Sequence, residues 1–186
     1  MSKIQARATG AIMRRALLLG AVALLAAVAS PAPAVAGTFL KLANVLGDST
    51  AENHVGEIDI LTFTQSFTRS GPRLDKVQCG PITLMKNIDS SSPELLKLVA
   101  TARHAPSALL TFQSNSTPAA DYYTISMIEV DVIELTQTDA ADSARIVEKV
   151  VLAARRFIFT FFPQSETGGN ASPVQFGWDC VTNSSL

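Results

Sequence analysis

Histidine and cysteine are scarce in this sequence, which contains two of each among 186 residues. No H-x-x-x-H or C-x-x-C spacing occurs, so a zinc site has no local support. The sequence also lacks the G-x-S-x-G turn of hydrolases, a phosphate-binding loop and a dinucleotide fingerprint. These absences remove the common signatures of metal, acyl-transfer and nucleotide chemistry. We therefore expect no enzyme activity, no catalytic or metal-binding residues and no cofactor.

Acidic residues are missing from the first 36 positions, which carry four of the chain's 15 basic residues: Lys3, Arg7, Arg14 and Arg15. An uncharged apolar run follows at residues 16–29, shorter than the ~20 residues that a spanning helix needs. Small residues at Ala34 and Ala36 complete the layout of a cleavable export signal. We predict that residues 1–36 are removed and that 37–186 form one domain. An uncleaved membrane anchor is the alternative, and the sequence does not separate the general from the twin-arginine export route.

Residues 37–186 keep 11 basic and all 16 acidic side chains, a net charge of −5. This balance excludes general nucleic-acid binding, which needs a basic surface, and it disfavours docking on anionic membranes. Cys79 and Cys180 both lie in this part. In an exported protein two cysteines suggest a disulfide, so we predict a Cys79–Cys180 bond, formed after export, in the periplasm or outside the cell. The alternative is a pair of buried, reduced thiols.

Strand patterns dominate the rest of the chain. Residues 57–67 alternate, with Leu61, Phe63 and Phe67 on one side, and the phase of residues 122–135 slips near Met127. Helical spacing follows Pro93 over residues 90–104. The predicted strands, about seven, are 37–45, 57–67, 77–86, 108–113, 122–135, 144–163 and 174–180, of which 144–163 also fits a helix. This composition predicts a mainly β fold, a two-sheet barrel or sandwich with one helix.

The last strand contains the only tryptophan of the chain, in PVQFGWDC at residues 173–180. Phe176 and Trp178 are two residues apart, so on a strand they face the same side. We predict that both anchor the closing strand in the core, because an aromatic side chain buries a large area. Cys180 shares this face if the strand stays regular.

Six segments in order resemble the Hcp family, the tube subunit of the type VI secretion system. They are FLKLANVLGDST, HVGEIDILTFTQSF, VQCGPITLMKNIDSSSPELLKLVA, YYTISMIEVDVIEL, VVLAARRFIFTFFPQ and VQFGWDC, and together they cover nearly all of residues 38–182. The resemblance implies two sheets closed as a β-barrel with one helix alongside, and it assigns residues 144–163 to a strand. It also implies six-membered rings that stack into a tube carrying effectors. The export signal and the cysteine pair set this chain apart from ordinary members of that family.

The leading hypothesis for function is an exported, Hcp-like structural protein that forms hexameric rings. Its partners would be copies of itself and secretion-system components or effectors, with no nucleic acid and, in the mature form, no membrane. Arg69 and Arg73, together with the loops at 46–56 and 68–76, are the candidate ring interface. One alternative is a monomeric binding module on the same barrel. The other is an exported hydrolase or toxin, for which only polar groups such as His104 and Cys79 are available.

Overall fold

The computed structural model describes residues 36–186 except 74, 117, 140–144 and 164–171, so nearly all of the predicted export signal lies outside the described residues. The described residues form eleven strands and one helix. The predicted fold class, mainly β with one helix, is confirmed. The elements are β1 (Gly37–Leu42), β2 (Ile58–Asp59), β3 (Thr62–Thr64), β4 (Phe67–Ser70), β5 (Lys76–Cys79), β6 (Ile82–Asn87), α1 (Ser92–Thr101), β7 (Ala105–Gln113), β8 (Asp121–Asp139), β9 (Ile146–Phe161), β10 (Val174–Asp179) and β11 (Ser184–Ser185).

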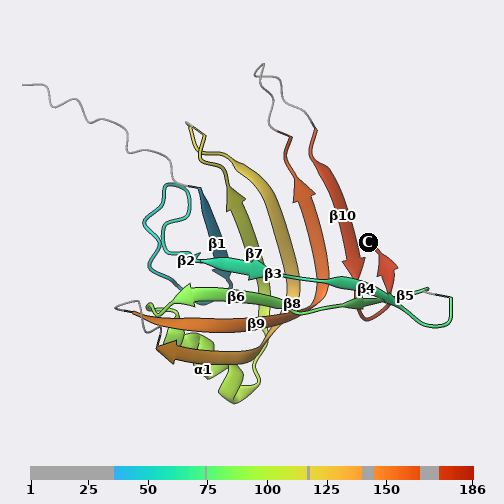
Figure 1. The fold of residues 1–186 in the computed structure, drawn as a ribbon, viewed down its shortest axis with the longest axis horizontal. Coiled ribbons are helices and arrows are strands. Elements are labelled where there is room, and N and C mark those ends of the chain that lie inside the picture. Colours follow the sequence, from blue (N-terminus) through green and yellow to red (C-terminus); the bar gives the residue numbers. More distant parts are fainter. Residues whose placement is uncertain (1–35, 74, 117, 140–144, 164–171) are drawn as a thin grey trace, which may run out of the picture. The chain divides into compact units, whose positions relative to one another are not determined.

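Two long strands, β8 and β9, pair along almost their whole length and belong to both layers of the fold. The second half of β9 pairs with β10, and its first half pairs with β6. Figure 1 shows both strands bending from an upright sheet, which also contains β1, β7 and β10, into a lower layer with β6 and β3. The two-sheet core expected from sequence is therefore present. The hydrogen-bonded ladder itself does not close into a barrel, because it ends at β2 and β11.

The predicted strand at 57–67 is divided into β2, β3 and β4, because the chain passes from one sheet edge to another within it. The Ile60 amide donates to Thr38 of β1 at 2.8 Å, whereas the next amide, of Leu61, donates to Met85 of β6 at 2.7 Å. Ile58 and Ile60 are buried, but the Leu61 side chain is 53% exposed. The prediction that Leu61 lies on the apolar side of this strand is therefore wrong, because the chain changes its partner strand at this residue. The predicted strand at 77–86 is likewise divided, at Gly80-Pro81, into β5 and β6.

Three further local predictions are confirmed: the strand at 146–161, the phase slip in β8 and the helix. Residues 146–161 are a strand, as the resemblance implied. In β8 the buried positions shift from Ile125 and Met127 to Val130 and Val132. Glu129, between them, has a φ of 55°, so the backbone itself reverses the phase that the sequence pattern showed. The helix α1 has Pro93 in its first turn and buries Leu95 in the core.

The core face of the upright sheet continues onto the closing strand. Backbone register aligns two rows of side chains across the five strands β1, β7, β8, β9 and β10. The first row is Leu40, Leu110, Ile125, Phe159 and Phe176. The second row is Leu42, Ala108, Met127, Phe157 and Trp178. Phe176 and Trp178 thus share a face, as predicted, and their rings lie 6.2 Å apart.

The predicted role of Phe176 as a core anchor is wrong, because its side chain is 55% exposed, while Trp178 is half-buried. Phe67 of β4 covers Phe157 and Phe159, with ring centroids at 5.6 and 5.5 Å. Phe176 lies on the next strand out, so this cover protects β9 and leaves the corner at Phe176 open.

Candidate functional site: the disulfide-linked arm

The hairpin of β4 and β5 is a two-stranded sheet of its own, paired with no other described strand. We call residues 67–79 the arm. Figure 1 shows it leaving the lower layer and running past the end of β10 and β11. Phe67, at its base, packs edge-on against Phe157 and Phe159 of β9. Most described side chains further along the arm are exposed. Among the described residues, contacts with the body hold the base, where Cys79 pairs with Phe67, and Val77 two residues further out.

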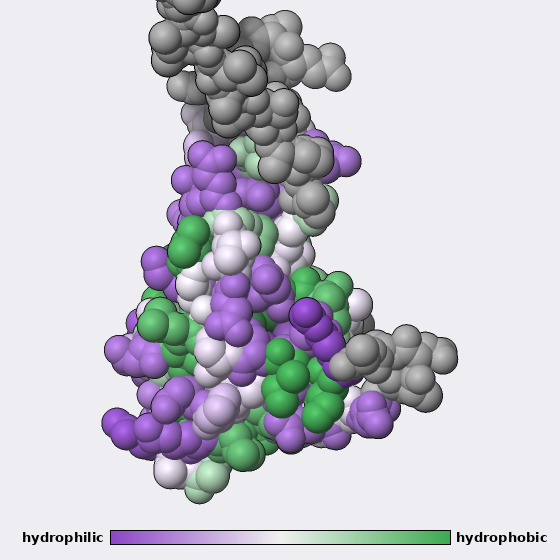
Figure 2. All heavy atoms as spheres, turned by 90° about the vertical axis from the view of Figure 1, so that its left-hand side faces the viewer, coloured by the Kyte–Doolittle hydropathy of each residue, from purple (hydrophilic) through white to green (hydrophobic). Residues whose placement is uncertain are grey.

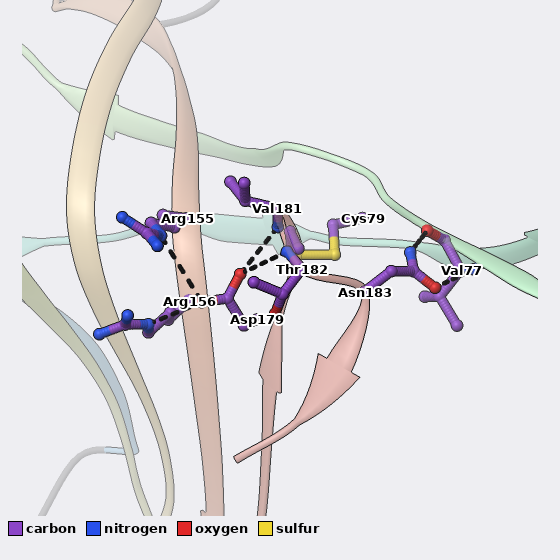
Figure 3. Close-up of a disulfide and its surroundings, with 9 residues drawn as sticks. Val77, Cys79, Arg155, Arg156, Asp179, Val181, Thr182 and Asn183 are labelled. Carbon is purple, nitrogen blue, oxygen red and sulfur yellow. Dashed lines mark hydrogen bonds and ion pairs between the residues drawn. A yellow bond between two sulfur atoms is a disulfide. The ribbon is translucent and has the colours of Figure 1, made fainter.

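Residues 180–183 form a tight turn between β10 and β11, which we call the closing turn. The buried carboxylate of Asp179 organises this turn: its Oδ1 accepts the amides of Val181 and Thr182, both at 2.9 Å. Its Oδ2 accepts a hydrogen bond from Arg156 Nε of β9 at 2.8 Å. The Cys180 amide donates to the Arg155 carbonyl at 2.8 Å. Figure 3 shows the bonds that Asp179 accepts from Arg156, Val181 and Thr182. These bonds tie the closing turn to β9 and involve no residue of the arm.

The electrostatics of the closing turn keep Asp179 ionised. The hydrogen bond from Arg156, followed by that from the Thr182 amide, holds the pKa of the Asp179 carboxyl well below its usual range. The same bond raises the pKa of Arg156. A second guanidinium, of Arg155, lies with Nε 3.5 Å from Asp179 Oδ2. The Arg156–Asp179 pair therefore stays charged at neutral pH.

Two links join the closing turn to the arm. One is the disulfide between Cys79 and Cys180, whose Cα atoms lie 6.0 Å apart. The other is the amide side chain of Asn183, whose Nδ2 donates to the Val77 carbonyl at 2.6 Å while its Oδ1 accepts from the Val77 amide at 3.1 Å. Asn183 thereby takes the place of a neighbouring strand along the edge of β5 (Figure 3). The predicted disulfide is confirmed, and a bonded Cys79 cannot act as a nucleophile.

A buried polar network lies where β6 leads into α1. Lys86 Nζ donates to Glu148 Oε2 at 2.8 Å, to Asp89 Oδ1 at 2.7 Å and to Ser92 Oγ at 3.2 Å. Glu148 also accepts hydrogen bonds from Ser92 at 2.6 Å and Gln137 at 2.7 Å. Burial raises the pKa of Glu148, but the hydrogen bonds from Lys86, Ser92 and Gln137 together lower it by more. The net result is a pKa below the usual value for a glutamate. The network therefore holds an ionised pair that ties β6, β9 and the helix together.

The two histidines lie in separate places and form no joint site. His54 is buried and stacks on Phe39, with ring centroids 4.1 Å apart, and its ring nitrogens lie 2.9 Å from Glu57 and 3.2 Å from Asp121. His104 is exposed and pairs with Asp131. Among the described residues, no cluster of three or more His, Cys, Asp or Glu side chains has an arrangement suited to a metal ion.

Sequence reasoning assigned no role to several residues that hold this site together. Asp179 carries a weak signal, since an aspartate before a polar run typically caps a turn. Asn183, Lys86 and Glu148 carry none, because their partners lie far away in sequence. The predicted interface residues Arg69 and Arg73 are brought together on the arm, where both are exposed.

The model of the family described as "Type VI secretion system effector, Hcp" matches residues 39–161. The chain belongs to the Hcp family. Its β10, closing turn and β11 lie beyond the matched residues, so Cys180 is outside the family match while Cys79 is inside it. As a member of the Hcp family, the chain is a type VI secretion system protein.

Individual relatives agree with this assignment. The chain is 27% identical to Protein hcp1 of Pseudomonas aeruginosa over 154 residues, which cover 78% of this chain and 95% of that protein. A solved "type six secretion system protein" shares the fold with a TM-score of 0.75 at 20% identity, covering 82% of this chain and all of the other. Hcp1 from Salmonella typhimurium gives 0.68 at 21% identity, with coverages of 81% and 99%. None of the helices among the described residues has the length and apolar character needed to cross a membrane.

Proposed function

We propose that the chain is exported and assembles into hexameric rings related to the type VI secretion tube. The observation that carries this proposal is membership of the Hcp family over most of the folded domain. Ring subunits that repeat head to tail need two different surfaces that fit each other on neighbouring copies. In a single copy, such a surface would contain exposed groups, for example charges, that lack a partner.

The arm is the strongest such feature, because it is basic on an acidic chain. It holds three basic residues, Arg69, Arg73 and Lys76, and one acidic residue, Asp75, which leaves 8 basic and 15 acidic residues elsewhere in 37–186. All three cations are exposed, and none has a hydrogen bond or ion pair to the described residues through its side chain. Charge complementarity steers association and fixes the register of partners. We infer that the arm contacts the acidic body of a neighbouring copy.

The loop at 46–56 supplies the second predicted contact region. It folds on itself through the bonds Gly47 N to Gly56 O and Ser49 N to Glu57 O. Leu46 and Val55 project from it, both largely exposed. Figure 2, which views the side of β1 and β2, shows small apolar patches separated by polar surface. This mixture fits a polar interface, whose strength depends on salt because exposed charges are screened.

Light scattering coupled to gel filtration tests the proposal on the exported product of the full chain. We expect a hexamer at tens of micromolar, weakened by Arg69→Glu or Arg73→Glu and by high salt. Arg103→Glu is the matched control, since Arg103 is also an exposed cation without an ion pair but lies outside the arm. If both arm variants assemble like the control, the arm is not the contact. A strict monomer in the unaltered protein ends the ring proposal and favours a monomeric binding module.

A further inference from the structure

We propose that the Cys79–Cys180 disulfide is a redox latch that fixes the arm, so that the surface for a second copy is complete only after the thiols are oxidised. The disulfide joins two parts of the fold. The closing turn is the stationary half, and the arm is the half that the bond captures. The effect on assembly rests on the proposed function. The effect on the arm does not, because it concerns a single copy.

The stationary half is built without the disulfide. The strand β10 pairs with β9 at six positions, ending at Asp179 opposite Arg156. Asp179 then accepts two amides of the turn and the Arg156 hydrogen bond, while the Cys180 amide bonds to β9. These contacts hold the backbone of Cys180 beside the arm whether or not its sulfur is bonded.

The captured half has few other contacts. Among the described residues, the base of the arm is held by Phe67, by its register partner Cys79 and by the bond from the Gly80 amide to Ser66 O. Further out, the arm meets the body through Val77, which Asn183 caps. Its own sheet pairs only four residues of each strand. A two-stranded hairpin alone is marginally stable in water. Without the disulfide, β5 would lose its covalent link at the base, and the Asn183 hydrogen bonds to Val77 would have to hold it on the closing turn against competition from water.

Formation of the latch is a thiol–disulfide exchange. The two thiols lose two protons and two electrons and form the S–S bond, and a disulfide-donating oxidoreductase is reduced to its dithiol. The cytoplasm keeps thiols reduced, whereas the bacterial periplasm oxidises them. With the export signal that the sequence predicts, the chain reaches the periplasm with both thiols reduced, so the arm is fixed only there. Premature binding between copies in the cytoplasm is thereby avoided.

Hydrogen exchange measured by mass spectrometry, at sub-micromolar concentration to avoid association, tests the latch itself. The oxidised protein is compared with Cys79→Ser/Cys180→Ser and with Asn183→Ala, which keeps the disulfide. We expect the arm amides to exchange at least about tenfold faster in the double variant, and less so in Asn183→Ala. Amides of Val181 and Thr182 should speed up less than the arm amides, because Asp179 still holds the closing turn on β9. Faster exchange in β8 and β9 reports the loss of global stability and not the latch. Equal protection of the arm in all three proteins, or equal loss from the arm and the closing turn, overturns the proposal.

Gel filtration of the oxidised, reduced and re-oxidised protein then tests the effect on assembly. We expect oligomers in the two oxidised samples and monomer in the reduced one. If both redox states assemble equally, the latch does not control assembly and that part of the proposal is wrong. If no state assembles, the proposed ring function fails, while hydrogen exchange still decides whether the arm is latched.

Discussion

At the scale of single residues, the buried pair of Lys86 and Glu148 has a large expected effect on stability. Their side chains are 1% and 0% exposed, and a buried charge is stable only while its partners remain. The pair connects β6 with β9, whose first half would otherwise meet β6 through backbone bonds and apolar contacts alone. Replacing one member of the pair therefore tests how much the pair contributes to holding the lower layer together.

We predict that Lys86→Met lowers the free energy of unfolding by about 3–5 kcal/mol, because Glu148 is left charged and buried without its cation. Urea unfolding followed by circular dichroism measures the change. The control is Lys86→Met/Glu148→Leu, which removes both charges and should recover most of the loss. A single variant within about 1 kcal/mol of the original protein would show that the pair contributes little.

The same pair predicts a pH dependence. The pKa of Glu148 is lower in the folded protein than in the unfolded chain, so the folded state binds this proton less readily. Its contribution to stability is complete above the unfolded value of about 4.3 and declines as the pH falls through the lower folded value. We expect the difference in unfolding free energy between the original protein and Lys86→Met/Glu148→Leu to shrink in that acidic range. A difference that stays constant down to acid unfolding would contradict this assignment.

At the scale of elements, the closing strand is held at its end rather than along its face. Phe157 of β9 is fully buried, whereas Phe176, one strand further out in the next row, is mostly exposed. We predict that Phe157→Ala costs about 3–5 kcal/mol of stability, while Phe176→Ala costs clearly less because it leaves no closed cavity. Thermal unfolding of both variants measures the contrast. Equal losses would mean that the corner at Phe176 is covered in solution.

The disulfide makes the second contribution at this scale. It joins positions 101 residues apart, and the chain-entropy model gives about 4–5 kcal/mol for a loop of that length. We predict that Cys79→Ser/Cys180→Ser lowers stability by up to this amount, with the midpoint of urea unfolding shifted accordingly. Asn183→Ala, with the disulfide intact, should cost about 1 kcal/mol. A reduced protein as stable as the oxidised one would mean that the bond constrains neither state.

At the scale of the whole molecule, the proposed latch would couple assembly to the compartment in which the chain resides. Residues 1–36 are predicted to direct export, and the cysteine pair is suited to an oxidising compartment. We predict that the full chain, expressed in a Gram-negative host, yields a periplasmic or secreted product that begins at Gly37, as intact-mass analysis would measure. Export with the first 36 residues retained would point to a membrane anchor instead. Full-length protein in the cytoplasmic fraction would contradict export altogether.

Local patterns in the sequence were enough to predict most of the strands, the helix begun by Pro93, the phase slip in β8 and the shared face of Phe176 and Trp178. These features depend on backbone sterics and side-chain period, which neighbouring residues set. Residues 144–163 were assigned to a strand by the resemblance to the Hcp family, because their pattern also fits a helix. The Cys79–Cys180 pairing was predictable as well, because only two cysteines are available.

Only the tertiary structure decided which groups meet and what is covered. Lys86 and Glu148 are 62 residues apart, and Val77 and Asn183 are 106 apart. No local pattern marks such partners, because their contact depends on how β6, β9 and the arm fold together. The same reason explains the two errors. Leu61 is exposed because the chain changes its partner strand at that point, and Phe176 is exposed because the arm covers β9 but not β10. Burial is a property of the assembled layers, whereas the sequence by itself determines only which face a side chain shares.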